Sequence, residues 1–310
     1  SYHSSMVSKY TVQTLNLCYC NSLRQSELDK PWREILWGKE EKERLMEEIR
    51  TLTPKYKEAK ELRIMMTGQI KAGKSSYINT IDSVFQGNLT SRALAGEDEH
   101  SFTKKFKPFR VEDCAHGKGD RVLPFVIYDI MGINIIVKHP DDFISAVKGH
   151  IKDGYRFNTK EPVRPLSVES PVYNKNPTVN DEAHCLVYCV AADQLSIMQD
   201  NVLQVMKEIR SQVSDKDISQ VVLLTKVDKA CPLVGKDIRK VYRSKYIKEK
   251  IEMFSQILGI PINHILPVKN YSEKISLDDD IDVLALTALL QILRFTNGHL
   301  LNLKLKKYEK

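Results

Sequence analysis

The sequence contains no uninterrupted apolar run of the roughly 20 residues that a membrane-spanning helix needs. Its most apolar stretch, 281–295, is interrupted by Asp282 and Arg294. The first residues, SYHSS, show no basic segment followed by an apolar one, which is the pattern of a secretory signal. We therefore expect a cytoplasmic protein without a transmembrane segment.

Cysteine, glycine and proline are also sparse. The six cysteines form no C-x-x-C pair, and the C-x-C at Cys18 and Cys20 lacks a second pair at zinc-ligand spacing. Cys185 and Cys189 lie in an apolar run, where a reduced thiol behaves as a small hydrophobic group. Thirteen Gly and twelve Pro among 310 residues are too few for a fibrous or low-complexity chain. These counts predict a globular protein whose cysteines have no metal or redox role.

Excess charge of one sign is confined to two C-terminal segments. The net charge is +7, and residues 229–250 alone hold eight Lys or Arg against two Asp or Glu. Residues 301–310 add four Lys against one Glu, so the remainder of the chain is slightly negative. We favour a solvated basic face at 236–250 and a solvated tail. The alternative is a surface for an acidic partner, RNA or anionic lipid.

Short apolar runs alternate with longer amphipathic segments, a pattern typical of a parallel sheet covered on both faces. Strands are predicted at 62–67, 121–129, 185–191, 221–225 and 262–268. Helices are predicted from Pro31 to before Pro54, after Lys74, and at 141–150, 197–213, 236–258 and 281–296. Residues 149–182 contain four prolines and little periodicity, which indicates an irregular insertion outside the core. His184 directly precedes a predicted strand, and we expect it to be structural.

Residues 68–75 (GQIKAGKS) match the phosphate-binding pattern G-x-x-x-x-G-K-S/T in full. The motif has the required context of a strand before it and a helix after it. The two glycines let successive backbone N–H groups point at phosphates, and the helix N-terminus adds its dipole. Lys74 supplies charge to the β- and γ-phosphates, and the Ser75 hydroxyl becomes a Mg²⁺ ligand. The predicted nucleotide-binding residues of this element are Gly68, Gln69, Ile70, Lys71, Ala72, Gly73, Lys74, Ser75 and Ser76.

Two further elements predict a metal and γ-phosphate site. Asp129 ends a strand and begins D-x-x-G, so its carboxylate is placed to hold Mg²⁺ and the Gly132 N–H to sense the γ-phosphate. Thr103 lies 26 residues before Asp129 and offers a switch hydroxyl to Mg²⁺. The alternative for Thr103 is an ordinary threonine at the start of a strand.

Two later elements predict guanine recognition. Residues 225–228 (TKVD) close a strand, and a carboxylate at Asp228 accepts two N–H bonds from a guanine edge, a pair that adenine does not offer. The Lys226 stem is placed to lie along the base. Val268, Lys269 and Asn270 follow the next strand, where a backbone N–H meets the guanine carbonyl. Thr225 replaces the usual Asn, which leaves an ATPase as an alternative.

The four motifs in this order resemble the P-loop GTPases of the translation-factor class. They predict a three-layer α/β G-domain fold that binds GTP or GDP with Mg²⁺. Residues 61–300 form the G domain, with the insertion at 149–182, a helical lead-in at 31–60 and a basic tail at 301–310. Residues 1–30 are weakly patterned.

Ile133 stands where many GTPases carry a glutamine that orients the attacking water. An apolar side chain cannot do this, so hydrolysis has to rely on other groups or on a partner. Gln69 and Lys71 in the phosphate loop are the candidates, with Thr103 at the switch. The Lys71 ammonium is placed to stabilise charge between the phosphates, and its alternative is a solvated lysine at a loop tip.

Several strings are similar to the interferon-induced protein 44 and 44-like family. They are 31–37 (PWREILW), the 68–76 loop, 101–104 (SFTK), 128–132 (YDIMG), 224–228 (LTKVD) and 267–271 (PVKNY). The resemblance runs from about Pro31 to the C-terminus. It implies a cytosolic, interferon-responsive guanine-nucleotide-binding protein associated with antiviral defence. Many members carry a TLDc-type domain upstream, and we expect this chain either to lack that domain or to hold only a remnant of it in residues 1–30.

Two functional readings remain open beside the ATPase alternative. The first is a GTP-binding switch with slow or partner-stimulated hydrolysis that assembles with itself on GTP. The second is a scaffold in which the nucleotide is a fixed structural ligand that is not hydrolysed. The intact Lys74, Ser75, Thr103 and Asp129 favour the first reading, and Ile133 favours the second.

Overall fold

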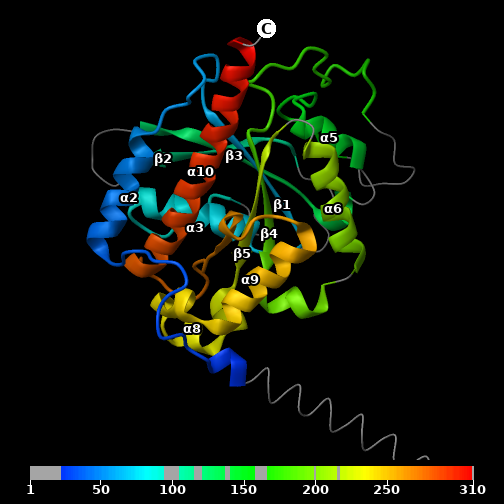
Figure 1. The fold of residues 1–310 in the computed structure, drawn as a ribbon. Helices are drawn as coiled ribbons and strands as arrows, with labels where there is room; N and C mark the ends of the chain where they lie inside the picture. The colour runs from blue at the N-terminus through cyan, green and yellow to red at the C-terminus, as the bar shows by residue number, and fades with distance from the viewer. Residues whose placement is uncertain are drawn as a thin grey trace, which may run out of the picture.

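The computed structural model describes residues 22–93, 105–114, 121–136, 140–157, 166–198, 200–214 and 217–308. Its centre is a six-stranded sheet in the order β2-β3-β1-β4-β5-β6 (Figure 1). The strands are β1 Leu62–Gly68, β2 Pro108–Asp113, β3 Arg121–Gly132, β4 Cys185–Ala191, β5 Ser219–Thr225 and β6 Ile265–Pro267. Only β2 runs antiparallel to its neighbour; every other pair is parallel. The predicted mostly parallel α/β sheet is confirmed.

Helices cover both faces of this sheet, so the fold has three layers (Figure 1). One face is covered by α2 Lys39–Thr51, α3 Lys74–Gln86 and α10 Asp279–Tyr308. The other is covered by α5 Pro140–Val147, α6 Asp200–Ser214 and α9 Lys245–Leu258. Short helices α4 Ile133–Ile136, α7 Val227–Ala230 and α8 Pro232–Lys236 complete the loops, with single 3₁₀ turns at Ala192–Ile197, Ile238–Arg243 and Ile262–His264.

The strands explain why their sequences read as continuous apolar runs. All seven residues of β1 and all seven of β4 are buried. Successive side chains enter opposite hydrophobic clusters: Met65 packs with α5, α6 and α9, whereas Ile64 and Met66 pack with α2, α3 and α10. A parallel sheet covered on both faces needs apolar residues at every position rather than at alternate ones.

Two predicted helices are wrong in their bounds. The helix predicted from Pro31 begins only at Lys39, because Gly38 has a φ of 90° and residues 31–37 form an irregular segment. The helix predicted at 236–258 is a 3₁₀ turn followed by α9, because extended backbone at Ser244 separates them. The Ser244 hydroxyl accepts the Ile247 N–H and caps the new helix. The edge strand β2 was not predicted, because its sequence alternates charged and apolar residues only weakly.

The basic tail is not a separate element. Helix α10 continues through it to Tyr308. Within the described chain, α10 has the length and hydropathy of a membrane span, but 72% of its apolar window is buried inside the protein. Most of its buried apolar side chains, from Val283 to Leu300, pack in the cluster with α2 and α3, as expected of a core helix, whereas Leu284 packs in the cluster on the other face.

The basic segment 229–250 is largely neutralised by acidic partners. At least five of its eight cations form ion pairs: Lys229–Glu273, Arg239–Asp280, Lys240–Glu27, Arg243–Glu27 and Lys248–Glu252. Two of these pairs use Glu27, which lies on the N-terminal segment. In the tail, Lys306 pairs with Asp217 and Lys307 with Glu58. The pairing favours a solvated, ion-paired face over a binding surface for polyanions.

The described parts of the insertion lie on the surface but are anchored to the core. Ile151 and Phe157 are buried in the same cluster as α5 and α6. Buried Asp142 accepts hydrogen bonds from the Tyr155 hydroxyl at 2.9 Å and the Leu166 N–H at 2.8 Å. The prediction that 149–182 stays outside the core is therefore wrong for its first part.

Candidate functional site

The predicted site lies where the parallel strands β1, β4, β5 and β6 end. The loop after β1 requires glycine at two positions. A Cβ on Gly68 would lie 2.2 Å from the Cys189 carbonyl oxygen, so only glycine lets β1 and β4 approach this closely. Gly73 has a φ of 87° and precedes α3 in the left-handed conformation. Both glycines shape the turn from strand to helix.

Lys74 points back into this loop. Its side chain is almost fully buried, and Nζ lies 3.4 Å from Gly68 O and 3.3 Å from Gln69 O. Helix α3 has no acidic residue in its first turn, so the positive end of its dipole is left for an external anion. A buried ammonium beside a helix N-terminus without an acidic first turn is the arrangement that suits a phosphate group.

The tip of the loop is exposed. Ile70 is 48% exposed and Lys71 is also exposed, whereas Gln69 is half-buried. Lys71 has a φ of 63°, a left-handed conformation that costs a non-glycine residue about 1 kcal/mol. The structure thus places both candidate catalytic side chains of the loop at its rim.

The D-x-x-G element lies beside the phosphate loop. The Ser75 hydroxyl donates to Asp129 Oδ2 at 2.7 Å, which brings two of the predicted Mg²⁺ residues together. Gly132 pairs in register with Gly68, and a Cβ on it would lie 3.3 Å from Gly68 O. The third predicted metal residue, Thr103, falls outside the described residues. Within the ranges that the structure describes, no group of three or more His, Cys, Asp or Glu side chains is arranged to hold a metal ion.

The two base-recognition segments hold the phosphate loop directly. The Thr225 hydroxyl is fully buried and lies 2.6 Å from Ala72 O. The Asn270 side chain donates from Nδ2 to Gly73 O at 3.2 Å. These contacts place residues 225–228 and 268–270 against the loop, so the structure brings together the motifs that the sequence predicted to cooperate.

Asp228 faces Lys269 across the base side of the site. Its Oδ2 lies 3.5 Å from Lys269 Nζ, and its side chain is 13% exposed. Lys226 lies two residues before Asp228 and adopts a left-handed conformation with a φ of 55°. A carboxylate held at the rim by one lysine retains lone pairs for two further N–H donors.

Two predicted contributors have other roles in the structure. The Val268 N–H donates to Leu224 O at 2.8 Å, so among residues 268–270 this N–H is already used within the sheet. Thr225 is too deeply buried to reach a base and instead supports the phosphate loop. Ile133 is also buried, in the cluster with α5 and α6, in agreement with its exclusion as a water-orienting group.

Sequence reasoning missed Tyr271 as part of the site's support. Its N–H donates to the Thr80 hydroxyl of α3 at 3.2 Å, and its own hydroxyl donates to Asp282 at 2.6 Å. In the sequence, Tyr271 stands out only as the last residue of the string 267–271, one of those that carry the family resemblance. Hydrogen bonds between segments that are far apart in the chain leave no periodic pattern.

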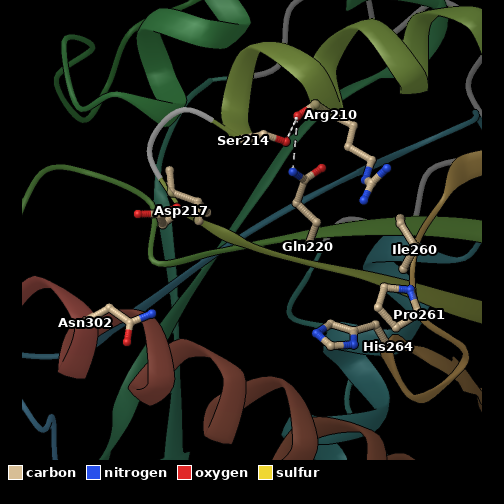
Figure 2. A pocket seen from close by; sticks show the side chains of 9 residues that line it. Arg210, Ser214, Asp217, Gln220, Ile260, Pro261, His264 and Asn302 are labelled. Carbon is tan, nitrogen blue, oxygen red and sulfur yellow. Dashed lines mark hydrogen bonds between the residues drawn. The ribbon is translucent and has the colours of Figure 1, made fainter.

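A separate cleft of about 330 Å³ lies at the opposite, amino-terminal edge of the sheet (Figure 2). Its polar side chains hold the chain together. Arg210 donates from Nη1 to Leu258 O at 2.8 Å, at the end of α9. Gln220 donates to the Arg210 carbonyl at 3.3 Å. This cleft lies away from every predicted nucleotide-binding residue.

No family model matches the chain. It is 31% identical to interferon-induced protein 44-like of Homo sapiens over 278 residues, which is 89% of this chain and 60% of that protein. It is 31% identical to interferon-induced protein 44 of Mus musculus over 264 residues, 85% of this chain and 61% of that protein. The chain therefore spans about three fifths of the length of these curated relatives. A solved structure, a probable GTP-binding protein engB, aligns with a TM-score of 0.41 and 14% identity over 75% of this chain and 98% of that one.

Proposed function

The chain belongs, over the matched region, to the interferon-induced protein 44 and 44-like family, and we propose that it binds guanine nucleotide through residues 68–75, 225–228 and 268–270. One observation carries the proposal. The buried Lys74 ammonium and the Asp228 carboxylate lie on loops that Thr225 and Asn270 bind together. One side of this unit suits phosphate and the other suits a base edge with two N–H donors.

Phosphate binding follows from the backbone. Residues 69–73 wrap over the N-terminus of α3, and Lys74 already lies among their carbonyls. A bound phosphate would replace the carbonyls as the partner of Lys74, which exchanges weak neutral acceptors for a charged one. Removing the ammonium should weaken binding strongly while leaving the fold intact, because Lys74 forms no part of either hydrophobic cluster.

The residues fit Mg²⁺. A serine hydroxyl and a carboxylate oxygen 2.7 Å apart are the oxygen donors that this ion prefers when phosphates and water complete its shell. Ser75 would contact the ion and Asp129 would hold it through water. The ion would neutralise charge on the phosphates.

Guanine selectivity rests on Asp228. Guanine offers N1–H and an exocyclic NH₂ side by side, and a carboxylate accepts both. Adenine presents an acceptor at N1, which a carboxylate repels. Thr225 contacts Ala72 O of the phosphate loop, so in this proposal its replacement of Asn bears on the support of the loop, and competition between GTP and ATP decides the ATPase alternative.

Hydrolysis in this proposal is slow or dependent on a partner. Ile133 is packed in the core and has no polar atom to orient water. Gln69, Lys71 and Thr103 remain the candidate groups, with Lys71 exposed at the rim. The second candidate function, a scaffold that keeps its nucleotide, is favoured by the same burial of Ile133.

Nucleotide binding is tested by chromatography of the nucleotide released when the purified protein is denatured, followed by competition of GTP and ATP for a fluorescent GDP. GTP should compete at least about a hundredfold better than ATP. Lys74→Ala should weaken GDP binding by at least about a hundredfold. Asp228→Asn should lose guanine and gain xanthine nucleotide, which has a carbonyl in place of the NH₂ group. Equal competition by ATP would reject guanine recognition.

Single-turnover GTP hydrolysis with Mg²⁺ and K⁺ separates the switch from the scaffold. A rate above the Lys74→Ala background supports the switch. Lys71→Ala with unchanged affinity and unchanged turnover would exclude Lys71 from hydrolysis. A nucleotide that stays intact and bound in wild-type protein would establish the scaffold.

The wider role is part of the same proposal. We expect a cytoplasmic, interferon-responsive protein of antiviral defence that self-associates when GTP is bound. Binding of RNA, anionic lipid or an acidic partner through 236–250 and the tail is the weaker part, because ion pairs already neutralise most of that surface.

A further inference from the structure

The loop between β6 and α10 is bonded to the phosphate loop by Asn270 and to helix α3 by Tyr271. Asn270 donates from Nδ2 to Gly73 O at 3.2 Å, and the Tyr271 N–H donates to the Thr80 hydroxyl of α3 at 3.2 Å. Asn270 Oδ1 is buried without a hydrogen-bond partner among the described residues. It remains an acceptor that a hydroxyl or amino group of a bound nucleotide can satisfy.

The Tyr271 side chain carries this contact to the start of α10. Its hydroxyl donates to Asp282 Oδ1 at 2.6 Å and accepts the Asp278 N–H at 2.7 Å. Burial, together with the hydrogen bond to Asp282, raises the pKa of the Tyr271 hydroxyl far above its ordinary value. The phenol therefore stays protonated and remains a donor.

Asp282 is reached from its other side by the lead-in helix. Its side chain is fully buried, and Lys42 Nζ of α2 lies 2.7 Å from Oδ2 and 3.1 Å from Asp279 Oδ1. Burial lowers the pKa of Lys42, but the bonds and charges of Asp282 and Asp279 outweigh it and raise that pKa overall. Lys42 is thus charged and compensates a carboxylate that could not remain buried alone.

We propose that Tyr271, Asp282 and Lys42 are positioning residues that couple occupancy of the phosphate loop to the order of helix α2. The proposal rests on the proposed function. A nucleotide on the loop fixes Gly73, which fixes Asn270 and Tyr271, and through Asp282 it fixes Lys42. Helices α2, α3 and α10 lie together on one face of the sheet (Figure 1). The contacts from Asn270 through Tyr271 and Asp282 to Lys42, called the relay below, therefore stay within one layer.

The coupling is reciprocal by thermodynamic necessity. If nucleotide stabilises α2, the contacts that hold α2 must raise nucleotide affinity by the same factor. If helix α2 is already ordered, binding of nucleotide to the phosphate loop costs less conformational entropy, and the reverse also holds. The lead-in helix is thereby both a reporter of the nucleotide state and a means to change it.

The test measures amide hydrogen exchange of residues 39–51 and the dissociation rate of a fluorescent GDP, on the full chain with Mg²⁺. GDP should slow exchange in α2 of the wild-type protein. Tyr271→Phe should release GDP about tenfold faster and abolish this protection, since it removes a hydrogen bond to a charged group. Lys42→Met should act in the same direction. The matched controls are Tyr56→Phe and Lys39→Met, whose exposed partners lie outside the relay.

The outcomes separate this inference from the proposed function. Absence of GDP binding by the wild-type protein would overturn the proposed function itself. If the wild-type protein bound GDP but exchange in α2 did not slow, only the coupling would be overturned. This measurement uses the wild-type protein and does not depend on a folded variant. The coupling would also be overturned if Tyr271→Phe released GDP no faster than the control Tyr56→Phe. Urea unfolding of each variant shows that the folded state is being compared.

Discussion

The two edges of the central sheet use polar residues in opposite ways. At the carboxyl-terminal edge, charged groups are retained near strained backbone: Lys74 is buried among carbonyls, and Lys71 and Lys226 are left-handed. At the amino-terminal edge, the buried His184 between β1 and β4 is neutral, and both of its ring nitrogens are hydrogen-bonded. Lys74 at the first edge contacts only the carbonyls of its own loop in these hydrogen bonds, whereas Arg63 and His184 at the second edge bind the backbone of residues 179–182 and close the chain.

His184 shows the amino-terminal pattern in detail. The Arg63 N–H donates to Nδ1 at 3.1 Å, so the Nε2–H donates to Val179 O at 2.7 Å and the ring is neutral. Burial lowers the pKa of His184 to about 3, and the neighbouring His299 is lowered in the same direction. The expectation that His184 is structural fits this environment. Four substitutions or conditions, from the largest expected effect to the smallest, test the contrast between the edges.

Gly68→Ala should have the largest effect. A Cβ there would meet the Cys189 carbonyl at 2.2 Å, and backbone cannot move aside as a flexible side chain can. We expect a loss of at least about 3 kcal/mol in the free energy of unfolding by urea. The matched control is Gly298→Ala in α10, where a Cβ meets nothing within 4 Å. That change should stabilise the protein by up to about 1 kcal/mol, as Ala does in helices. Equal effects at both positions would contradict the proposed close approach.

Lowering the pH should have the second-largest effect, a loss of folding stability that arises at the amino-terminal edge. His184 has a folded pKa of about 3, below the unfolded value near 6.5, so the unfolded state binds the extra proton. Stability is therefore complete above pH 6.5 and falls as the pH drops toward 3. Between pH 7 and pH 5 the loss from this residue should be about 2 kcal/mol in urea unfolding. His184→Gln should be less stable at pH 7 but show a flatter pH dependence. A variant as pH-dependent as the wild type would assign the effect elsewhere.

Thr225→Val tests the support of the phosphate loop with a smaller effect. The isosteric change removes the hydroxyl that lies 2.6 Å from Ala72 O and leaves that carbonyl without this donor. We expect about 1–2 kcal/mol of lost stability and weaker GDP binding. Thr51→Val at the end of α2, where the hydroxyl is exposed, should change neither quantity appreciably. An unaltered GDP affinity in Thr225→Val would show that this hydrogen bond does not contribute to nucleotide binding.

Lys240→Met should have the smallest effect. Lys240 pairs with Glu27 at 2.9 Å on the surface, away from both edges. Exposed ion pairs contribute little and are screened by salt. Stability should fall slightly at low ionic strength, and the difference from wild type should vanish in 0.5 M salt (about 4 Å screening length). A large loss of stability that does not depend on salt would show that the Lys240–Glu27 contact stabilises the N-terminal segment more than an exposed ion pair should.

The sequence predicted most of the sheet because a strand covered on both faces needs a local run of apolar residues. It placed β1, β4 and β5 to within two residues and identified α3 from the motif before it. It failed where a single residue breaks a periodic pattern, as Gly38 and Ser244 do. Hydrophobic periodicity continues across such positions, and only backbone conformation shows the break.

The site divides in the same way. The phosphate-loop residues were predictable because their chemistry is contained in eight consecutive positions. The supporting contacts were not, since Asn270 reaches Gly73 across 197 residues and Tyr271 reaches Asp282 in a different element. The hydrogen bond that occupies the Val268 N–H depends on the pairing of β6 with β5, which no single segment specifies.

The sequence alone determined that this protein has a phosphate-binding loop in an α/β fold and that its excess positive charge lies in 229–250 and the tail. Only the tertiary structure decided what that charge does, because at least five of the eight cations meet acids, most of them distant in the chain. It also decided that the lead-in helix shares a buried ion pair with α10. Local chemistry is written in consecutive residues, whereas neutralisation and coupling depend on which segments the fold brings together.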